Sequence, residues 1–276
     1  MEKSWKIIFL LTFFVFLLFL FMMAKRKTGT REWAESNYNI GVGCAHDCRY
    51  CYARASAVRF KQIPSNEAWT QERLKDKMPA VTKKQGWIMF PTTHDITPFY
   101  LPAAVDALKK LLVKGNNVLI VSKPHLVCIA ELCEQLEQWR SQILFRFTIG
   151  AYTEEDAAFW EPGAPIIGER VKCLMYAHEH GFSTSVSMEP MLSPVDQIYY
   201  SFVFLAPYVT DKIWIGKMNK IDGRVAKVSP EVVAKCDAVR ANQTDEKILW
   251  LYEQLKDHPK VAWKDSIQEV LANHSL

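Results

Sequence analysis

Residues 38–51 read YNIGVGCAHDCRYC, and this stretch brings Cys44, Cys48 and Cys51 within eight positions of one another. The six residues before the cysteines read as a short strand that ends in glycine. Thiolates bind soft or borderline metal ions, so three thiols at this spacing indicate a metal or cluster site. We therefore expect a metal-binding loop immediately after the first strand.

The residues around the cysteines narrow the kind of group that they hold. Haem attachment needs Cys-x-x-Cys-His, but Tyr52 follows Cys51. Structural zinc needs four closed ligands, and His46, in the same tight loop, is a candidate for the fourth. Iron–sulfur clusters are normally held by four cysteines, so a three-cysteine site leaves one iron without a protein ligand. We expect a small molecule with an amine and a carboxylate at that iron, and zinc remains the alternative.

The composition is that of a globular protein in a reducing compartment. The chain has 276 residues, of which 49% are hydrophobic and 23% charged, which suits one large α/β domain or two small ones. Seven cysteines, an odd number, do not make a disulfide framework in a chain of this length. The net charge of +4 is too small to indicate binding to nucleic acid or to an anionic membrane by itself.

An uncharged segment, residues 7–23, reads IIFLLTFFVFLLFLFMM, with Thr12 as its one polar residue. As a helix it is just long enough to cross a hydrocarbon core of about 30 Å. Basic residues after the segment outnumber those before it, so the positive-inside rule predicts a cytoplasmic location for the rest of the chain. A later translation start at Met22 or Met23 is the alternative. Residues 1–27 are therefore interpreted either as an anchor in the cytoplasmic membrane or as a start-site error.

Short apolar runs alternate with amphipathic stretches along the rest of the chain. Six strands are predicted, at residues 38–43, 86–93, 117–124, 143–150, 182–190 and 212–219. The clearest predicted helices are residues 101–115, 130–140 and 166–181. This alternation is typical of a parallel sheet with helical crossovers, and no glycine fingerprint for a nucleotide opens the first crossover. We expect an α/β fold: a partial or complete (β/α) barrel over residues 28–228, with C-terminal helices over residues 229–276.

The cysteine spacing, with Tyr50 before the third cysteine and at the carboxyl end of the first strand, resembles the motif of the radical S-adenosylmethionine (SAM) superfamily. Three further stretches resemble successive blocks of the branch that contains spore photoproduct lyase and the DNA-repair-photolyase-like proteins. They are THDITPFY at 93–100, VSKPHL at 121–126 and EPGAPIIGERVKCLMYAHEHGFSTSVSMEPML at 161–192. The resemblance extends from about Tyr38 to about Asn219.

This resemblance implies a radical enzyme. Cys44, Cys48 and Cys51 would hold a 4Fe-4S cluster, and SAM would bind the open iron through its amino and carboxylate groups. An electron from the reduced cluster would cleave SAM to methionine and a 5′-deoxyadenosyl radical, which abstracts hydrogen from an unreactive carbon of the substrate. A reductant such as flavodoxin or ferredoxin is the implied protein partner. The barrel would align radical and substrate and exclude water.

Polar residues at the strand ends are the candidates that the resemblance implies for binding SAM. Lys123 lies in a block where the related lyases also have a lysine, and its ammonium can approach the SAM carboxylate. Thr148 has a hydroxyl suited to the ribose, although threonine is also an ordinary strand residue. Arg170 could pair with the carboxylate or with Glu161. Each charged residue also has a plainer interpretation, as a surface group or as a residue that shapes a loop.

The end of the second predicted strand resembles the family in one respect and differs from spore photoproduct lyases in another. Thr92 and Thr93 lie where the family contacts the methionine amine through backbone and small polar side chains. Spore photoproduct lyases have a cysteine in this segment that returns hydrogen to the substrate radical, whereas this chain has Thr93 before His94 and Asp95. Repair of thymine photoproducts by that mechanism is therefore not expected. His94 is interpreted as a hydrogen-bonded structural histidine.

The sequence does not identify the substrate, and it leaves other classes of function open. The basic stretch GKMNKIDGRVAK, residues 216–227, leaves nucleic acid or another phosphorylated substrate open, although it lacks interleaved aromatic residues. A membrane-tethered, non-catalytic protein that binds zinc or an iron–sulfur cluster, or that carries electrons, is the alternative from a different class. The sequence has no second cysteine cluster near its C-terminus, so additional clusters are not expected.

Overall fold

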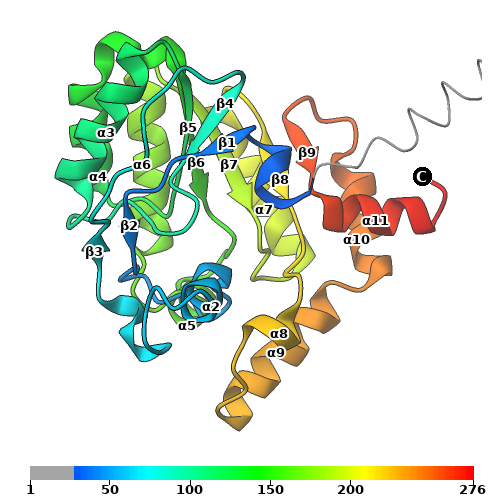
Figure 1. The fold of residues 1–276 in the computed structure, drawn as a ribbon. Helices are drawn as coiled ribbons and strands as arrows, with labels where there is room; N and C mark the ends of the chain where they lie inside the picture. The colour runs from blue at the N-terminus through cyan, green and yellow to red at the C-terminus, as the bar shows by residue number, and fades with distance from the viewer. Residues whose placement is uncertain (1–27) are drawn as a thin grey trace, which may run out of the picture.

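The computed structural model describes residues 28–276, and a seven-stranded parallel sheet lies at the centre of this part (Figure 1). The strands are β1 (Ser36–Asn37), β4 (Trp87–Phe90), β5 (Asn117–Ser122), β6 (Ile143–Thr148), β7 (Ser183–Met188), β8 (Ile213–Ile215) and β9 (Val261–Trp263). They neighbour one another in chain order, without the reversal of a doubly wound sheet. The predicted α/β fold with a parallel sheet is confirmed.

The sheet is open along one side. Within the described residues, β1 and β9 form its two edges and do not pair with each other. A side chain joins them instead: Lys264, directly after β9, donates from Nζ to the carbonyl of Gly29, 3.0 Å away, and pairs with Glu32 at 2.8 Å. Both partners belong to the 3₁₀ helix η1 (Gly29–Glu32), which precedes β1. The chain therefore forms a partial barrel, whose two edges are linked through η1.

The first predicted strand was only partly right. Residues 38–43 were expected to form one strand, but β1 ends at Asn37, and β2 (Gly41–Val42) pairs antiparallel with β3 (Arg73–Leu74) in a separate two-stranded sheet. The cause is His94, whose Nε2 accepts hydrogen bonds from the backbone N–H groups of Ile40 and Gly41 at 3.2 and 3.1 Å. Because these donors bind a side chain, the segment leaves the parallel sheet before it reaches the cysteines.

The C-terminal extension was expected to be helical, and it also supplies a strand. It contains the helices α9 (Pro230–Asn242), α10 (Asp245–Leu255) and α11 (Asp265–Asn273). Between α10 and α11, β9 pairs in parallel with β8 and extends the sheet. At three residues this strand is too short to show a two-residue periodicity, which is why the sequence did not indicate it. Residues 229–276 are thus part of the sheet as well as of its cover.

Helices cover the outer face of the sheet and enclose the core. The helices of the described part of the chain are α2 (Tyr52–Arg59), α3 (Leu101–Val113), α4 (Leu126–Gln135), α5 (Glu154–Trp160), α6 (Ile167–Glu179), α7 (Val195–Leu205), α8 (Ile221–Arg224) and the three helices already named, of which α2, α5, α8 and α9 lie below the sheet in Figure 1. Figure 1 shows α3, α4 and α6 together on one side, while α10 and α11 lie beyond β9. Leu108, Leu132, Phe145, Leu174 and Phe202 are fully buried between helices and sheet. Burial of such apolar surface is the main stabilising contribution.

Among residues 28–276, no helix is both long enough and apolar enough to cross a membrane. The hydrophobic segment predicted at residues 7–23 lies outside the described residues.

We expect Leu132→Ala to destabilise the fold strongly, because Leu132 is fully buried on α4, where that helix packs against α6. Loss of the leucine atoms and the cavity left behind should lower the free energy of unfolding by about 3 kcal/mol. Val127→Ala on the same helix is the control, since Val127 is 62% exposed and its truncation should cost less than about 0.5 kcal/mol. Urea unfolding of the two variants measures the difference, and equal losses would contradict this packing.

Candidate active site

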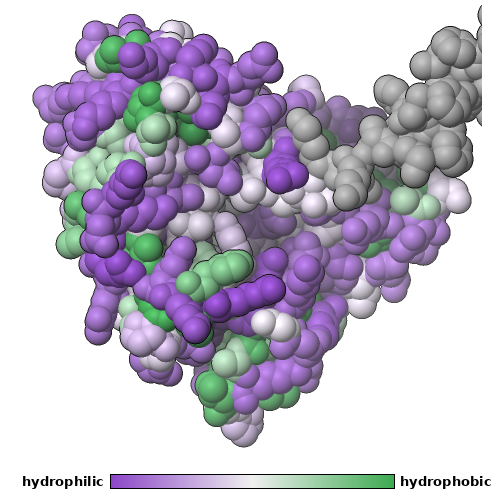
Figure 2. Space-filling view, viewed as in Figure 1, coloured by the Kyte–Doolittle hydropathy of each residue, from purple (hydrophilic) through white to green (hydrophobic). Residues whose placement is uncertain are grey.

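A cavity of about 250 Å³ opens at the carboxyl ends of the parallel strands. Figure 2 shows this face of the molecule hollowed near its centre, with hydrophilic side chains around the hollow. Many of the polar lining residues lie at or after the carboxyl ends of five successive strands, β4 to β8: Thr92, Thr93, Asp95, Ser122, Lys123, Thr148, Ser187, Glu189, Lys217 and Asn219. Ligands of parallel α/β folds bind at this edge, so the cavity is the candidate active site.

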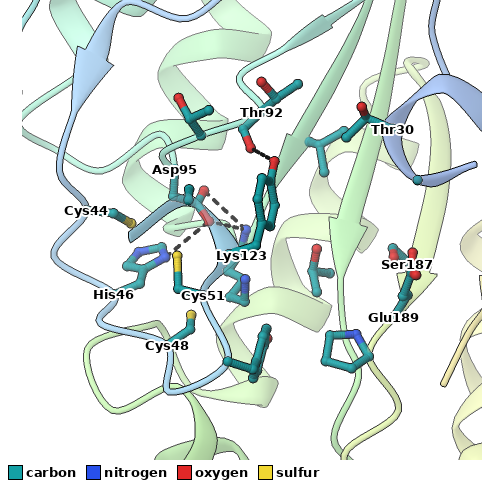
Figure 3. Close-up of a pocket in the computed structure, with 18 of the residues that line it drawn as sticks. Thr30, Cys44, His46, Cys48, Cys51, Thr92, Asp95, Lys123, Ser187 and Glu189 are labelled. Atoms are coloured by element: carbon teal, nitrogen blue, oxygen red, sulfur yellow. Dashed lines mark hydrogen bonds and ion pairs between the residues drawn. The ribbon is translucent and has the colours of Figure 1, made fainter. Parts of the chain in front are cut away.

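The three clustered cysteines line one side of this cavity (Figure 3). Cys44, Cys48 and Cys51 are all free, and they lie on one loop that ends at the start of α2. Arg54 on the first turns of α2 supports the loop by pairing with Asp47 at 2.7 Å. The other four cysteines of the chain are buried elsewhere and do not contribute to the cavity that the described residues form.

The chemistry of these thiols fits an iron–sulfur cluster. Burial raises the pKa of Cys44 well above its usual value and that of Cys48 to about 12, so both hold their protons until a metal replaces them. Within residues 28–276, no three His, Cys, Asp or Glu side chains are arranged to hold one metal ion. Structural zinc needs ligands that converge on one ion, whereas in a cluster each thiolate binds a different iron.

Asp95 ties the cysteine loop to the strand ends. Its Oδ2 accepts a hydrogen bond from Nδ1 of His46, between Cys44 and Cys48, at 3.1 Å, and another from the backbone N–H of Lys123 at 2.9 Å. Its Oδ1 accepts from the hydroxyl of Ser122. Although burial raises the pKa of Asp95, the charge and hydrogen bond of His46 outweigh it and hold that pKa well below its usual range. The carboxylate therefore stays ionised, and both of its oxygens accept hydrogen bonds.

A glycine supports the same loop from the other side. Gly163, in the loop after α5, donates its N–H to the carbonyl of His46 at 3.0 Å. A Cβ at this position would lie 2.0 Å from the carbonyl oxygen of Ala45, so no other residue fits without moving the loop. Arg49 of the loop also bonds α5, through its N–H to the carbonyl of Trp160 at 2.9 Å.

Lys123 lines the cavity, and its ammonium contacts a buried ion pair formed by Glu161 and Arg170. Its Nζ lies 3.9 Å from Oε1 of Glu161, whose Oε2 lies 2.5 Å from Arg170. Tyr50 donates its hydroxyl to the same Glu161 carboxylate. Burial lowers the pKa of Lys123, but the neighbouring Cys48, Glu161 and Asp95 outweigh that effect and raise it overall, so the lysine stays protonated.

The predicted SAM-binding residues divide into two groups. Thr92, Thr93, Lys123 and Thr148 line the cavity, at the ends of strands β4, β5 and β6. Glu161 and Arg170 are fully buried and lie outside the lining that the described residues form. Their contacts run to Lys123, Tyr50 and the carbonyl of Thr148, so their geometry fits a positioning role.

Sequence reasoning missed several residues of this site. Asn39, before the cysteines, holds the turn after β4 by accepting the N–H groups of Thr92 and Thr93 at 2.7 and 3.1 Å. Glu189 lies at the end of the strand predicted at residues 182–190 and directly follows the observed β7, so the strand-end rule could have found it. Lys264 had no such signal, because it follows the unpredicted strand β9.

The match to a known family agrees with this geometry. The model of the family described as the radical SAM superfamily matches residues 38–196, which include the cysteine loop and strands β4 to β7. The chain belongs to the radical SAM superfamily.

Individual relatives are distant. The uncharacterized protein ORF301 of Acidianus two-tailed virus is 27% identical over 169 residues, which cover 56% of each chain, so this chain spans about half the length of that relative. A spore photoproduct lyase variant with dinucleoside spore photoproduct is 12% identical, with a TM-score of 0.53 over 87% of this chain and 79% of the lyase. SuiB of Streptococcus suis, bound to the precursor peptide SuiA, also gives 12% and 0.53, over 87% of this chain and 51% of SuiB. At these identities, the two structures show a shared radical SAM fold.

His94 is expected to make stability depend on pH. Its Nδ1 donates to the carbonyl of Asp95, Nε2 accepts two backbone N–H groups, and burial lowers its pKa to about 4. Between about pH 6.5 and pH 4 the unfolded chain binds the proton and the folded chain does not, so stability present above pH 6.5 falls as the pH drops, by up to about 3 kcal/mol. His94→Gln keeps an acceptor but cannot titrate there. Urea unfolding at about pH 7, 6 and 5 should give a smaller pH dependence for the variant, and equal slopes would contradict the prediction.

Gly163→Ala is expected to weaken cluster retention. The new Cβ would displace the carbonyl of Ala45 and with it the cysteine loop, and outer supports of metal sites typically contribute about 10- to 100-fold in metal affinity. Gly223→Ala is the matched control, since a Cβ there has no atom within 4 Å. Iron and sulfide per chain after anaerobic reconstitution and chelator challenge measure the effect. Equal retention in both variants would contradict the prediction.

Proposed function

We propose that Cys44, Cys48 and Cys51 hold the 4Fe-4S cluster of this enzyme, and that a substrate bound in the same cavity loses a hydrogen atom. The observation that carries the proposal is the set of three free thiols on one loop, facing a cavity lined by polar strand ends. Three thiolates leave one iron of a cubane cluster without a protein ligand, which suits chelation by the amine and carboxylate of SAM. When bound, the cluster and SAM supply reductive cleavage to methionine and a 5′-deoxyadenosyl radical, which abstracts the hydrogen.

The residues of the cavity would orient SAM. The Lys123 ammonium supplies a positive charge for the SAM carboxylate, because it lines the cavity and stays protonated. The Thr148 hydroxyl, at the end of β6, is available to the ribose. Thr92 and Thr93, in the turn that Asn39 holds, offer small polar groups to the methionine amine.

Glu161 and Arg170 would act through Lys123 rather than on SAM directly. A lone lysine in this partly enclosed wall would be free to change rotamer or lose its proton. One oxygen of the Glu161 carboxylate pairs with Lys123, which keeps the lysine charged and fixes its position in the cavity wall. Arg170 pairs with the other oxygen of the same carboxylate. This arrangement preorganises the carboxylate-binding group before SAM arrives.

The substrate is expected to differ from that of spore photoproduct lyase. No cysteine other than Cys44, Cys48 and Cys51 lines the cavity formed by residues 28–276. This cavity therefore has no further thiol that could return a hydrogen atom to a substrate radical. The basic stretch at residues 216–227 offers limited support for a nucleic acid, because Lys217 and Lys227 already pair with Asp245 and Asp222.

The enzyme requires an external electron donor, for which we propose a flavodoxin or a ferredoxin in the cytoplasm. Seven cysteines without a disulfide among those described are consistent with a reducing compartment. Membrane attachment through residues 7–23 remains a prediction, and fractionation of chains started at Met1 and at Met23 tests it. If both chains remain in the supernatant, the anchor is contradicted.

The proposal is tested by anaerobic reconstitution with iron and sulfide, followed by dithionite and SAM, with 5′-deoxyadenosine assayed by chromatography. We expect the parent to form the nucleoside and the single variants Cys44→Ala, Cys48→Ala and Cys51→Ala to form none. Lys123→Met should raise the KM for SAM about 10-fold or more, because it removes a charge-assisted hydrogen bond, while the exposed Lys256→Met leaves it unchanged. A colourless protein with one zinc per chain, or a brown protein whose cysteine variants remain active, would contradict the proposal.

A further inference from the structure

The cavity extends away from the cysteines to a second group of polar residues. Thr30, Trp33, Ser187, Glu189 and Lys264 line this part, which we call the distal compartment. Figure 3 shows Thr30, Ser187 and Glu189 across the cavity from the three cysteine sulfurs. None of these residues belongs to the group proposed above to hold the cluster or SAM.

Ser187 and Glu189 present their side chains to the compartment together. They are two residues apart at the end of β7, and strand geometry directs residues i and i+2 to the same face. Two residues earlier on the same strand, Ser185 also faces the barrel interior, where its hydroxyl accepts a hydrogen bond from Arg146 at 2.9 Å. The inner face of β7 is thus a row of polar groups leading to the cavity.

Buried polar atoms without partners gather around this compartment. Among the described residues, Ser187 Oγ and Trp33 Nε1 are buried and make no hydrogen bond. Ser187 is 1% exposed and lines the cavity, so its hydroxyl has neither a protein partner nor open solvent. Folded proteins satisfy the large majority of such atoms, and unsatisfied ones beside a cavity indicate a missing ligand.

The charges around the compartment do not balance. Lys264 Nζ is shared between two carboxylates, at 2.8 Å from Glu32 and 3.3 Å from Glu189. Arg146, the other buried cation near Trp33, is already paired with Asp211 at 3.2 Å. Burial raises the pKa of Glu189, Lys264 lowers it, and the nearby Asp265 and Glu32 raise it further, so the one ammonium only partly compensates this carboxylate, which takes up a proton more readily than an ordinary glutamate.

We propose that the distal compartment is a substrate subsite for a positively charged group with hydrogen-bond donors, an amine or a guanidine. Two carboxylates that share one ammonium leave a negative charge unpaired, and a cationic donor would balance it while bonding Glu189 and Ser187. The carboxylates of Glu32 and Glu189 would repel an anionic group, so binding of an anion is disfavoured. That the bound group belongs to a substrate rests on the proposed function, whereas the charge preference of the compartment does not.

The test uses three probes of equal length, n-butylamine, n-butanol and butyrate. They are titrated into the reconstituted protein, saturated with SAM and without reductant so that no turnover occurs, and binding is followed by saturation-transfer NMR. We expect the amine to bind about 5-fold or more tightly than the alcohol, and butyrate to bind most weakly. Equal binding of amine and alcohol, preference for butyrate, or absence of amine binding would overturn the proposal.

Two variants locate the binding. Glu189→Gln should abolish the preference for amine over alcohol, and Glu231→Gln, which removes an exposed carboxylate on α9, should leave it unchanged. Where Glu189→Gln fails to fold or to load its cluster, Ser187→Ala provides the measurement. That variant removes no partner within the protein and should weaken amine binding about 2- to 5-fold. Unchanged amine binding in the variant that folds would overturn the proposal.

Failure of this inference and failure of the proposed function give different results. Loss of SAM cleavage with the amine preference intact would contradict the function and leave the subsite standing. Normal cleavage without the preference would contradict the subsite alone.

Discussion

The hydrogen bonds of Asp95 fix the geometry of the active-site edge. This one carboxylate accepts from His46 in the cysteine loop, from the Ser122 hydroxyl at the end of β5 and from the N–H of Lys123. It thereby sets the position of the three thiols relative to the lysine proposed to bind SAM. A buried carboxylate is stabilised only when it is paired and fully hydrogen-bonded, and Asp95 is both. If this carboxylate lost its partners, the loop would lose its link to the sheet.

A second ionic contact has the corresponding role across the open side of the barrel. Lys264 links the segment before β1, the carboxylate that follows β7 and the strand β9 of the C-terminal extension. Asp95 therefore organises the cluster side of the cavity, whereas Lys264 organises the distal compartment. Because the extension supplies both β9 and Lys264, it contributes to the proposed substrate side as well as to the stability of the sheet.

Local signals in the sequence predicted a large part of this arrangement. The cysteine spacing, the alternation of strands and helices, and the polar residues at strand ends led to a parallel α/β sheet and to Lys123, Thr92, Thr93 and Thr148 beside the cysteines. The rest depends on contacts between distant residues. His94 draws residues 40 and 41 out of the sheet, β9 is too short to show a pattern, and Lys264 pairs with Glu32 across the open side of the barrel. No spacing along the chain encodes such pairings, and the segment at residues 7–23 lies outside the described residues.

The central claim is that three thiolates hold the cluster and leave one iron for SAM. Mössbauer spectroscopy of protein reconstituted with iron-57, recorded with and without SAM, tests it most directly because it resolves iron atoms with different ligands. The account predicts that about one quarter of the iron signal changes on addition of SAM while the remainder stays as it was. A spectrum that SAM leaves unchanged, or iron that is not present as a 4Fe-4S cluster, would contradict it.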